Sequence, residues 1–208
     1  AGALYGSGEL KPIRVRMAVA RTLSLTAIVV LAGLSVITAK ATTSYIRAVQ
    51  AEAARKDLEW DDALRLANQA VRADAGYWRG HLERAHVLKS RGVWDLDADA
   101  ADAYARDAVT SYERVLAMNP HDDYARLELS RAYAALLGEA ERALALLREN
   151  VNNAPANAQF HAELGLRLRR MGRHREALDA FVAARKINPD DRMTRLNIRS
   201  LQKKLNLN

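Results

Sequence analysis

Four aspartates near the middle of the chain are the first side chains whose spacing suggests a chemical role. They are Asp95, Asp97, Asp99 and Asp102. Their spacing matches the start of a calcium-binding loop, but such a loop needs glycine at its sixth position and glutamate at its twelfth. Those positions hold Ala100 and Arg106. We therefore interpret the acids as the beginning of a helix over Ala100–Ala117, where negative charge interacts favourably with the helix dipole.

The five histidines do not match a metal site or a catalytic motif either, because no two of them are four residues apart. They are His81, His86, His121, His161 and His174. The sequence also contains no cysteine, no HExxH or GxSxG motif and no phosphate-binding loop. Disulfides, thiol catalysis and cysteine-bound zinc are thereby excluded. The sequence predicts a protein that is not an enzyme and that holds no metal or cofactor.

The composition indicates which elements position these residues. The chain has 208 residues, half of them hydrophobic, with only four prolines and ten glycines. Alanine, leucine and arginine are abundant and all favour helices, so we expect an all-α fold. The net charge is +7, and residues 1–40 supply +4 of it, from five basic side chains and one acidic one. The rest of the chain is only weakly basic, so we expect no nucleic-acid partner.

A repeat of 34 or 35 residues runs through the C-terminal part, where Pro120, Pro155 and Pro189 are 35 and 34 residues apart. Two other series keep the same intervals. They are Ala108, Ala143 and Ala177, and Tyr112, Leu147 and Phe181. In the last unit, a glycine at position 165 within a helical pattern costs about 1 kcal/mol against alanine, which indicates that another helix lies against it. We expect Gly165 and Ala177 to mark the contact between two helices, with Phe181 between neighbouring repeats.

The last unit carries the fullest signature. Its characteristic positions are Leu164, Gly165, Leu168, Gly172, Ala177, Phe181, Ala184 and Pro189. This pattern resembles the tetratricopeptide repeat (TPR), a hairpin of two helices that stacks into an α-solenoid. The resemblance covers about residues 44–205 and implies about four hairpins and a solvating C-terminal helix. It implies a fold and a groove, and little else about function.

The resemblance also gives the expected boundaries. Hairpins are expected at about residues 44–75, 78–120, 123–155 and 158–189, followed by a capping helix at 190–208. Ala63 and Ala108 are 45 residues apart, so about eleven residues more than one repeat lie in the second hairpin, near 93–103. We expect Trp60, Trp78 and Trp94 to pack between helices, although Trp94 lies in the inserted residues and could be exposed.

In a TPR array the first helix of each hairpin lines a concave groove. Matching these positions onto the last three hairpins gives Arg79, Leu82, His86, Lys89, Tyr124, Leu127, Arg131, Ala134, Gln159, Ala162, Leu166, Arg169 and Arg170. The first hairpin adds Tyr45, Ala48, Glu52, Arg55 and Lys56. Seven of these residues are basic and one is acidic. Arginine on a rigid scaffold suits bidentate binding of carboxylates, so an acidic or C-terminal peptide is the expected ligand. The alternative is that a basic protein has basic faces everywhere.

The N-terminal part of the chain contains an apolar stretch. Residues 22–39 carry no charge and are just long enough to span a bilayer as a helix. Lys11, Arg14, Arg16 and Arg21 precede the stretch. Because positive charge favours the cytoplasm, we expect a basic cytoplasmic segment at 1–21, a transmembrane helix at 22–39, and a periplasmic or extracellular TPR domain. The alternative is a signal peptide that begins at Met17 and is cleaved near Ala39-Lys40-Ala41. The first residue is alanine, which is compatible with processing or with a longer polypeptide.

Three functions agree with this layout. The first is a scaffold, anchored in the inner membrane of a bacterial-type cell, that docks partner proteins. Other membrane subunits could contact its span at Ala32, Gly33 and Ser35, since small residues permit close helix packing. The second rests on a resemblance to the C-terminal end of O-antigen ligase/polymerase-type membrane proteins, whose catalytic residues lie in upstream loops that this sequence does not contain. The third is a periplasmic assembly factor similar to the TPR subunits of cytochrome c maturation.

Overall fold

The structure is a computed structural model that describes the backbone of residues 11–207 and the side chains of residues 25–207. Within those residues it contains nine α-helices and no strands, which confirms the expected all-α fold. The helices are α1 (Lys11–Lys56), α2 (Trp60–Ala73), α3 (Trp78–Trp94), α4 (Ala98–Met118), α5 (Asp123–Leu136), α6 (Ala140–Asn153), α7 (Ala158–Arg170), α8 (His174–Ile187) and α9 (Arg192–Lys204). The side chains of the basic segment expected at residues 1–21 lie outside the described residues.

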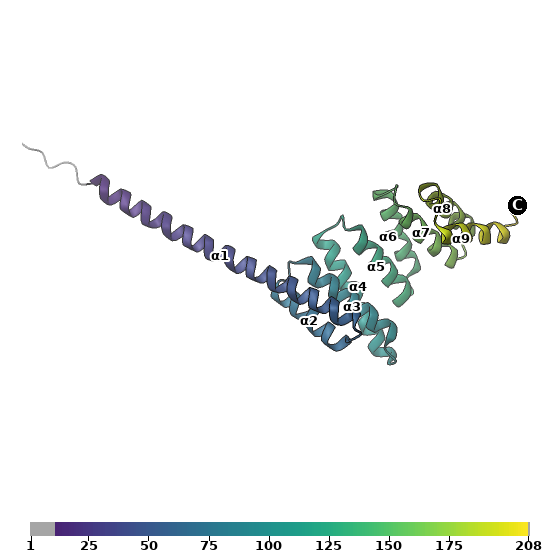
Figure 1. Cartoon of the computed structure of the whole chain (residues 1–208), viewed down its shortest axis with the longest axis horizontal. Coiled ribbons are helices and arrows are strands. Elements are labelled where there is room, and N and C mark those ends of the chain that lie inside the picture. Colours follow the sequence, from purple (N-terminus) through teal and green to yellow (C-terminus); the bar gives the residue numbers. More distant parts are fainter. Residues whose placement is uncertain (1–10, 208) are drawn as a thin grey trace, which may run out of the picture.

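Helix α1 joins the apolar stretch and the first solenoid helix into one uninterrupted helix of 46 residues. It projects from the solenoid as a long arm (Figure 1). Between residues 25 and 37 its apolar side chains are exposed. From Ser44 onward, a stripe of buried small residues, including Ala48 and Ala51, packs against α2 and α3. Within the described residues, α1 is long and apolar enough to cross a membrane, a property that a signal sequence shares.

The remaining helices stack as antiparallel pairs into a solenoid (Figure 1). In the α7–α8 pair, a Cβ atom added to Gly165 would lie 3.0 Å from ring atoms of Phe181, which confirms the expected close contact of the two helices. The Phe181 ring is buried together with Leu144 of α6 and Ile198 of α9, so it fills the space between neighbouring helix pairs as expected. The C-terminal helix α9 covers the last pair.

Three of the four hairpin turns contain a left-handed residue where the first helix ends, and the α3–α4 turn contains none. In the α5–α6 and α7–α8 turns, Gly138 and Gly172 take this conformation with φ angles of +68° and +77°. In the α1–α2 turn the same role falls to Leu58, with φ of +64°. A left-handed conformation costs a residue with a Cβ atom about 1–2 kcal/mol, and the Leu58 side chain is 66% exposed, so the residue type at this turn weakens the first hairpin.

The residues inserted in the second hairpin are mostly helical. Helices α3 and α4 have 17 and 21 residues, whereas the helices of the next two pairs have 13 or 14. Only a short turn separates α3 from α4, and the Asp97 carboxylate accepts hydrogen bonds from the backbone N–H groups of Asp99 and Ala100. This N-cap confirms that the aspartates begin a helix, two residues earlier than expected. Trp94 is 72% exposed, so it does not pack between helices.

Candidate binding face on the first helices

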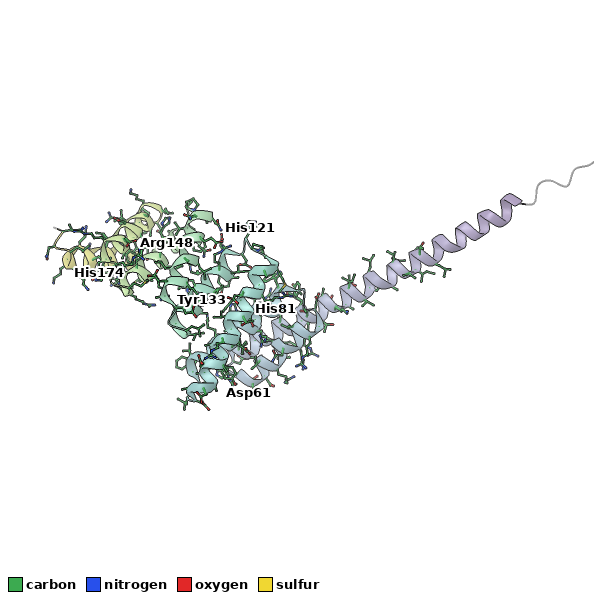
Figure 2. All side chains as sticks on the ribbon, turned by 180° about the vertical axis from the view of Figure 1, so that it is seen from behind. Asp61, His81, His121, Tyr133, Arg148 and His174 are labelled. Atoms are coloured by element: carbon green, nitrogen blue, oxygen red, sulfur yellow. The ribbon has the colours of Figure 1, made fainter. Side chains whose placement is uncertain are left out.

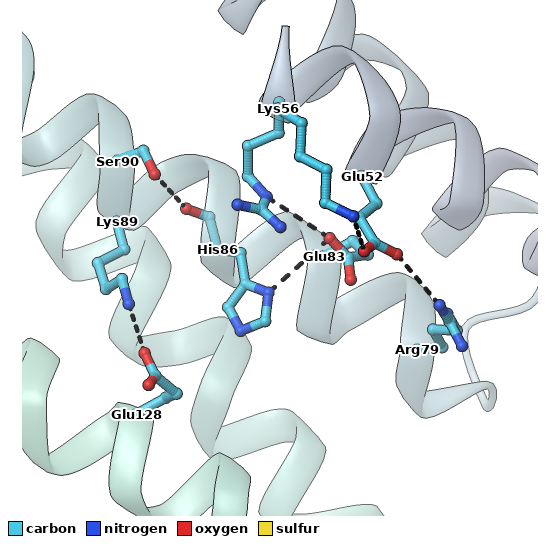
Figure 3. A network of polar contacts seen from close by, with 9 residues as sticks. Glu52, Lys56, Arg79, Glu83, His86, Lys89, Ser90 and Glu128 are labelled. Atoms are coloured by element: carbon cyan, nitrogen blue, oxygen red, sulfur yellow. Dashed lines mark hydrogen bonds and ion pairs between the residues drawn. The ribbon is translucent and has the colours of Figure 1, made fainter. Parts of the chain in front are cut away.

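Polar contacts link the first helices of successive pairs into a continuous line across the solenoid. Arg79 of α3 donates to Glu52 of α1 at 3.2 Å, and Lys89 of α3 pairs with Glu128 of α5, as Figure 3 shows. Arg131 of α5 then pairs with Glu163 of α7. We call this line the polar row. Its members are Glu52, Arg55, Arg79, Glu83, His86, Lys89, Glu128, Arg131, Glu163 and Arg169.

The polar row has four acids against five arginine and lysine side chains, and Lys56 and Arg170 bring the bases of the expected face to seven, so the face is less basic than expected. Three glutamates that the repeat alignment did not place on this face, Glu83, Glu128 and Glu163, lie among the basic residues and pair with them. The expectation of one acid against seven bases is therefore wrong for this face. The glutamates are 45 and 35 residues apart, which are the intervals of the repeat, so this spacing was the signal that could have revealed them.

The pKa values of three groups in the polar row are shifted in the direction that favours their charged forms. Burial acts to raise the pKa of Glu128, but the hydrogen bond and the charge of Lys89, together with Arg131, outweigh it and lower that pKa. Burial likewise acts against the charge of Arg131, yet Glu163 and Glu128 raise its pKa. A hydrogen bond from Lys56 lowers the pKa of Glu52. Glu52, Glu128 and Arg131 thus stay ionised across the physiological pH range.

Around Glu83 the polar row contains buried polar atoms that lack a hydrogen-bond partner. Glu83 is 5% exposed, and its Oε2 lies 3.7 Å from Arg55 Nε and 3.8 Å from His86 Nδ1, beyond hydrogen-bond distance. Among the described side chains, five such buried atoms belong to this region: Arg55 Nε, Arg79 Nε, Glu83 Oε2, His86 Nε2 and Tyr112 Oη. Buried polar groups in proteins nearly always have partners, so this cluster is suited to hydrogen bonds with water or a ligand.

Aromatic rings border the same cluster. The His86 ring lies 5.7 Å from that of Tyr112 and 6.1 Å, edge to face, from that of Tyr124, measured between ring centroids. The guanidinium carbon of Arg79 lies 5.3 Å from the ring centroid of Tyr45. Burial raises the pKa of Tyr124, so its hydroxyl stays neutral, and the Tyr124 residue is 53% exposed. The face therefore offers both rings and hydrogen-bonding groups.

The structure brings some predicted site residues together and separates others. Arg79, His86, Lys89 and Arg131 belong to the polar row, and Tyr124 lies beside it. Leu127 is only 2% exposed, since it packs with buried side chains of α6 and α7. Its prediction as a groove residue was therefore wrong.

The predicted site residues of α7 divide in the same way. Gln159 and Arg170 are exposed, whereas Leu166 is partly buried against the core. Arg169 Nη1 donates to Asn197 of α9 at 2.5 Å, so it helps to hold the C-terminal helix. Two further residues expected in the groove, Leu82 and Ala48, are buried.

The histidines outside the polar row include two with the same structural contact. His81 Nε2 lies 3.0 Å from the Ala75 carbonyl oxygen, and His161 Nε2 lies 2.9 Å from that of Pro155. Both contacts reach six residues back along the chain, so these two histidines occupy equivalent structural positions of the repeat. Among residues whose side chains are described, no group of three or more His, Asp or Glu is placed to hold a metal ion.

Comparison with family models gives no match, and neither does comparison with curated protein sequences. Solved structures do match. A crystal structure of MamA has a TM-score of 0.65 and 19% sequence identity over 79% of this chain and 84% of that chain. TTC0263, a thermophilic TPR protein of Thermus thermophilus, has a TM-score of 0.65 and 22% identity over 76% of this chain and 80% of that chain.

A third match is YrrB, described as a TPR protein with an unusual peptide-binding site. Its TM-score is 0.57, with 16% identity over 76% of this chain and 75% of that chain. At such identities the similarity shows the fold alone. Together with the stacked helix pairs, it establishes that the chain folds as a TPR-type α-solenoid that follows a long apolar N-terminal helix.

Proposed function

We propose that the protein is a membrane-anchored docking protein whose polar row binds a segment of a partner polypeptide. The observation that carries the proposal is the arrangement of the polar row beside the ring of Tyr124, which is 53% exposed, so that one face joins ion-paired side chains of α1, α3, α5 and α7 with an aromatic side chain. Tyrosine and arginine side chains contribute most often to the energetic centre of protein interfaces. This face is therefore suited to bind a polar segment of a partner.

A peptide backbone fits this face because it presents both donors and acceptors. Its carbonyl groups can accept from Arg55 and Arg79, and its N–H groups can donate to Glu163, since these three side chains are partly exposed. YrrB, which has the same fold, is described as having a peptide-binding site, and this supports a peptide ligand here. An acidic peptide would have to compete with Glu128 and Glu163 for the cations of the polar row. The proposed ligand is therefore a polypeptide segment with mixed polar groups.

The membrane part of the proposal rests on α1. Its side chains between Leu25 and Ile37 are exposed and apolar, and their transfer from water into a bilayer is favourable. Basic residues precede this stretch in the sequence, so we propose that the N-terminus is cytoplasmic and the solenoid non-cytoplasmic, in the periplasm of a bacterial-type cell. The small residues near Gly33 would then be available to other membrane subunits.

The test is affinity purification of the full chain from membranes with its partners. The groove variant is Tyr124→Ala with Gln159→Ala, since both side chains are exposed and carry no core packing. Arg131 and Arg169 are unsuitable probes, because reversal of their charge would break contacts between helices. Loss of an exposed aromatic anchor should weaken partner binding by about tenfold or more.

Two control variants complete the design. Arg114→Ala with Arg175→Ala removes exposed side chains from the second helices α4 and α8 and should leave the partners bound. Gly33→Leu alters the apolar arm without touching the solenoid. If partners are lost with Gly33→Leu and kept with the groove variant, the partners are held in the membrane and the polar row is not the docking face.

A further inference from the structure

The end of the solenoid formed by the first two hairpins carries an exposed apolar patch surrounded by acids. Leu58, Val93, Trp94 and Leu96 lie in or beside the α1–α2 and α3–α4 turns and are between 56% and 103% exposed. Trp60, Arg91, Trp94, Asp95 and Leu96 line a hollow of about 340 Å³ between these turns. Residues 57–62 and 93–102 contain eight acids and no bases: Asp57, Glu59, Asp61, Asp62, Asp95, Asp97, Asp99 and Asp102. Arg65, Arg91 and Arg106 of the flanking helices pair with four of these acids, and Asp57, Glu59, Asp97 and Asp99 form no ion pair among the described side chains. We call this region the acidic tip.

The acidic tip is held in a fixed shape. Arg91 of α3 pairs with Asp61 of α2, and its guanidinium carbon lies 4.9 Å from the ring centroid of Tyr104 of α4. The hydrogen bond with Asp61 raises the pKa of Arg91, so this contact stays charged. Three helices are thus locked around the hollow before any partner arrives, which lowers the entropic cost of binding there.

A membrane surface does not account for the exposed apolar side chains of the tip. Ile37 is the last large apolar residue of the uncharged stretch at 22–39, and Lys56 at the end of α1 follows it by nineteen residues of continuous helix. At about 1.5 Å per residue, the tip lies about 28 Å from the apolar stretch along the helix. With the apolar stretch in a membrane, the tip is therefore left free to meet a protein surface.

The opposite end of the chain carries a surface of complementary character. Helix α9 contains five bases and no acids. The bases are Arg192, Arg195, Arg199, Lys203 and Lys204. Among the described side chains, Arg192, Arg199, Lys203 and Lys204 form no ion pair. Two apolar side chains, Met193 and Leu196, are 64% and 44% exposed among these bases. We call this surface the basic cap.

The acidic tip and the basic cap lie at opposite ends of the solenoid. Asp61 marks the first end and His174, beside the cap, the other (Figure 2). The basic cap packs against α8 through Thr194, Ile198 and Leu201, whereas its charged side faces away from the solenoid. Within one copy the two surfaces cannot meet.

We propose that the acidic tip of one copy binds the basic cap of a second copy, so that the chains associate head to tail. Met193 and Leu196 supply apolar side chains for the hollow beside Trp60 and Trp94, and the bases of the cap face the acids that surround it. Opposite charges at the rim orient the two copies and suppress other arrangements. Because one contact leaves a free tip and a free cap, the association extends to further copies.

The test uses the full chain in detergent, studied by sedimentation velocity. The tip variant is Asp57→Lys with Glu59→Lys, and the cap variant is Arg199→Glu with Lys203→Glu. None of these four side chains forms an ion pair among the described residues, so the fold should be retained. Wild-type protein should associate, increased salt should weaken the association, and each variant alone should associate about tenfold or more weakly.

The decisive sample is an equal mixture of the two variants. The reversed tip then meets the reversed cap, and the unchanged tip meets the unchanged cap, so association should return. Arg114→Glu with Arg175→Glu changes the net charge as much as the cap variant does, on other exposed positions, and should associate like the wild type. As a second probe, Trp94→Ser should weaken association without a loss of helix content.

Three results would overturn the proposal. The first is wild-type protein that stays monomeric up to about 0.1 mM. The second is association of the tip and cap variants that is as strong as that of the wild type, which would place the contact elsewhere, such as on the apolar part of α1. The third is a mixture of the two variants that stays as dissociated as each variant alone.

Discussion

Replacement of Gly165 by leucine tests how tightly the last helix pair is packed. A Cβ atom at this position would lie 3.0 Å from three atoms of the Phe181 ring, whereas carbon atoms in favourable contact are about 3.5–4.0 Å apart. The Phe181 ring is 1% exposed and is enclosed by α6 and α9 as well. The ring therefore has little room to move, and a larger side chain must displace the helix.

The magnitude follows from two opposing effects. Overpacking of a core costs about 1–3 kcal/mol, while replacement of a helical glycine by alanine gains up to about 1 kcal/mol of helix propensity. Gly165→Ala should therefore be close to neutral or mildly destabilising. Gly165→Leu adds three more carbon atoms to a filled space and should destabilise by about 2 kcal/mol or more. For a domain of this size that is a decrease in Tm of about 4–8 °C.

Thermal unfolding of the full chain in detergent, followed by far-UV circular dichroism, measures the effect. Phe181→Ala alone should cost about 3–5 kcal/mol through the cavity that it leaves. Combined with Gly165→Leu it should cost less than the sum of the two single changes, because the leucine refills that cavity. A Tm for Gly165→Leu equal to that of the wild type, or costs that simply add in the double variant, would refute the close contact.

Three other predictions concern the first hairpin, the histidine of α3 and the topology of the chain. Leu58→Gly should raise stability by about 1 kcal/mol in the same melting assay, because glycine adopts the left-handed conformation without strain. Burial lowers the pKa of His81 in the folded chain. Below the ordinary histidine pKa of about 6.5, the unfolded chain therefore binds more protons than the folded one. The free energy of unfolding should decrease as the pH falls below that value, and this decrease should be smaller in His81→Gln. The chain has no cysteine, so Ser200→Cys would introduce a single thiol. With the solenoid on the non-cytoplasmic side, this thiol should react with an impermeant thiol reagent in cells with a permeabilised outer membrane. Protection of this cysteine would contradict the proposed topology.

The sequence by itself determined the features that depend on local periodicity. Its 34- and 35-residue intervals identified the all-α solenoid, because each hairpin repeats the same small and large residues where its two helices touch. Gly165 was recognised for this reason as a position where two helices touch, and Phe181 as a residue between neighbouring hairpins, whereas the contact between the two residues came from the structure. The beginning of α4 was also close to expectation, since an aspartate before an alanine-rich run caps a helix through its own neighbouring backbone.

Only the tertiary structure decided the character of the candidate binding face. Position within a repeat tells which way a residue points from its own helix, whereas exposure and charge pairing depend on the next hairpin. Leu127 is buried because α6 and α7 close over it. The contacts of Glu128 with Lys89, and of Arg131 with Glu163, join residues 39 and 32 positions apart in the chain. Such pairs form only when successive hairpins stack, so a face that is strongly basic by count becomes a row of ion pairs.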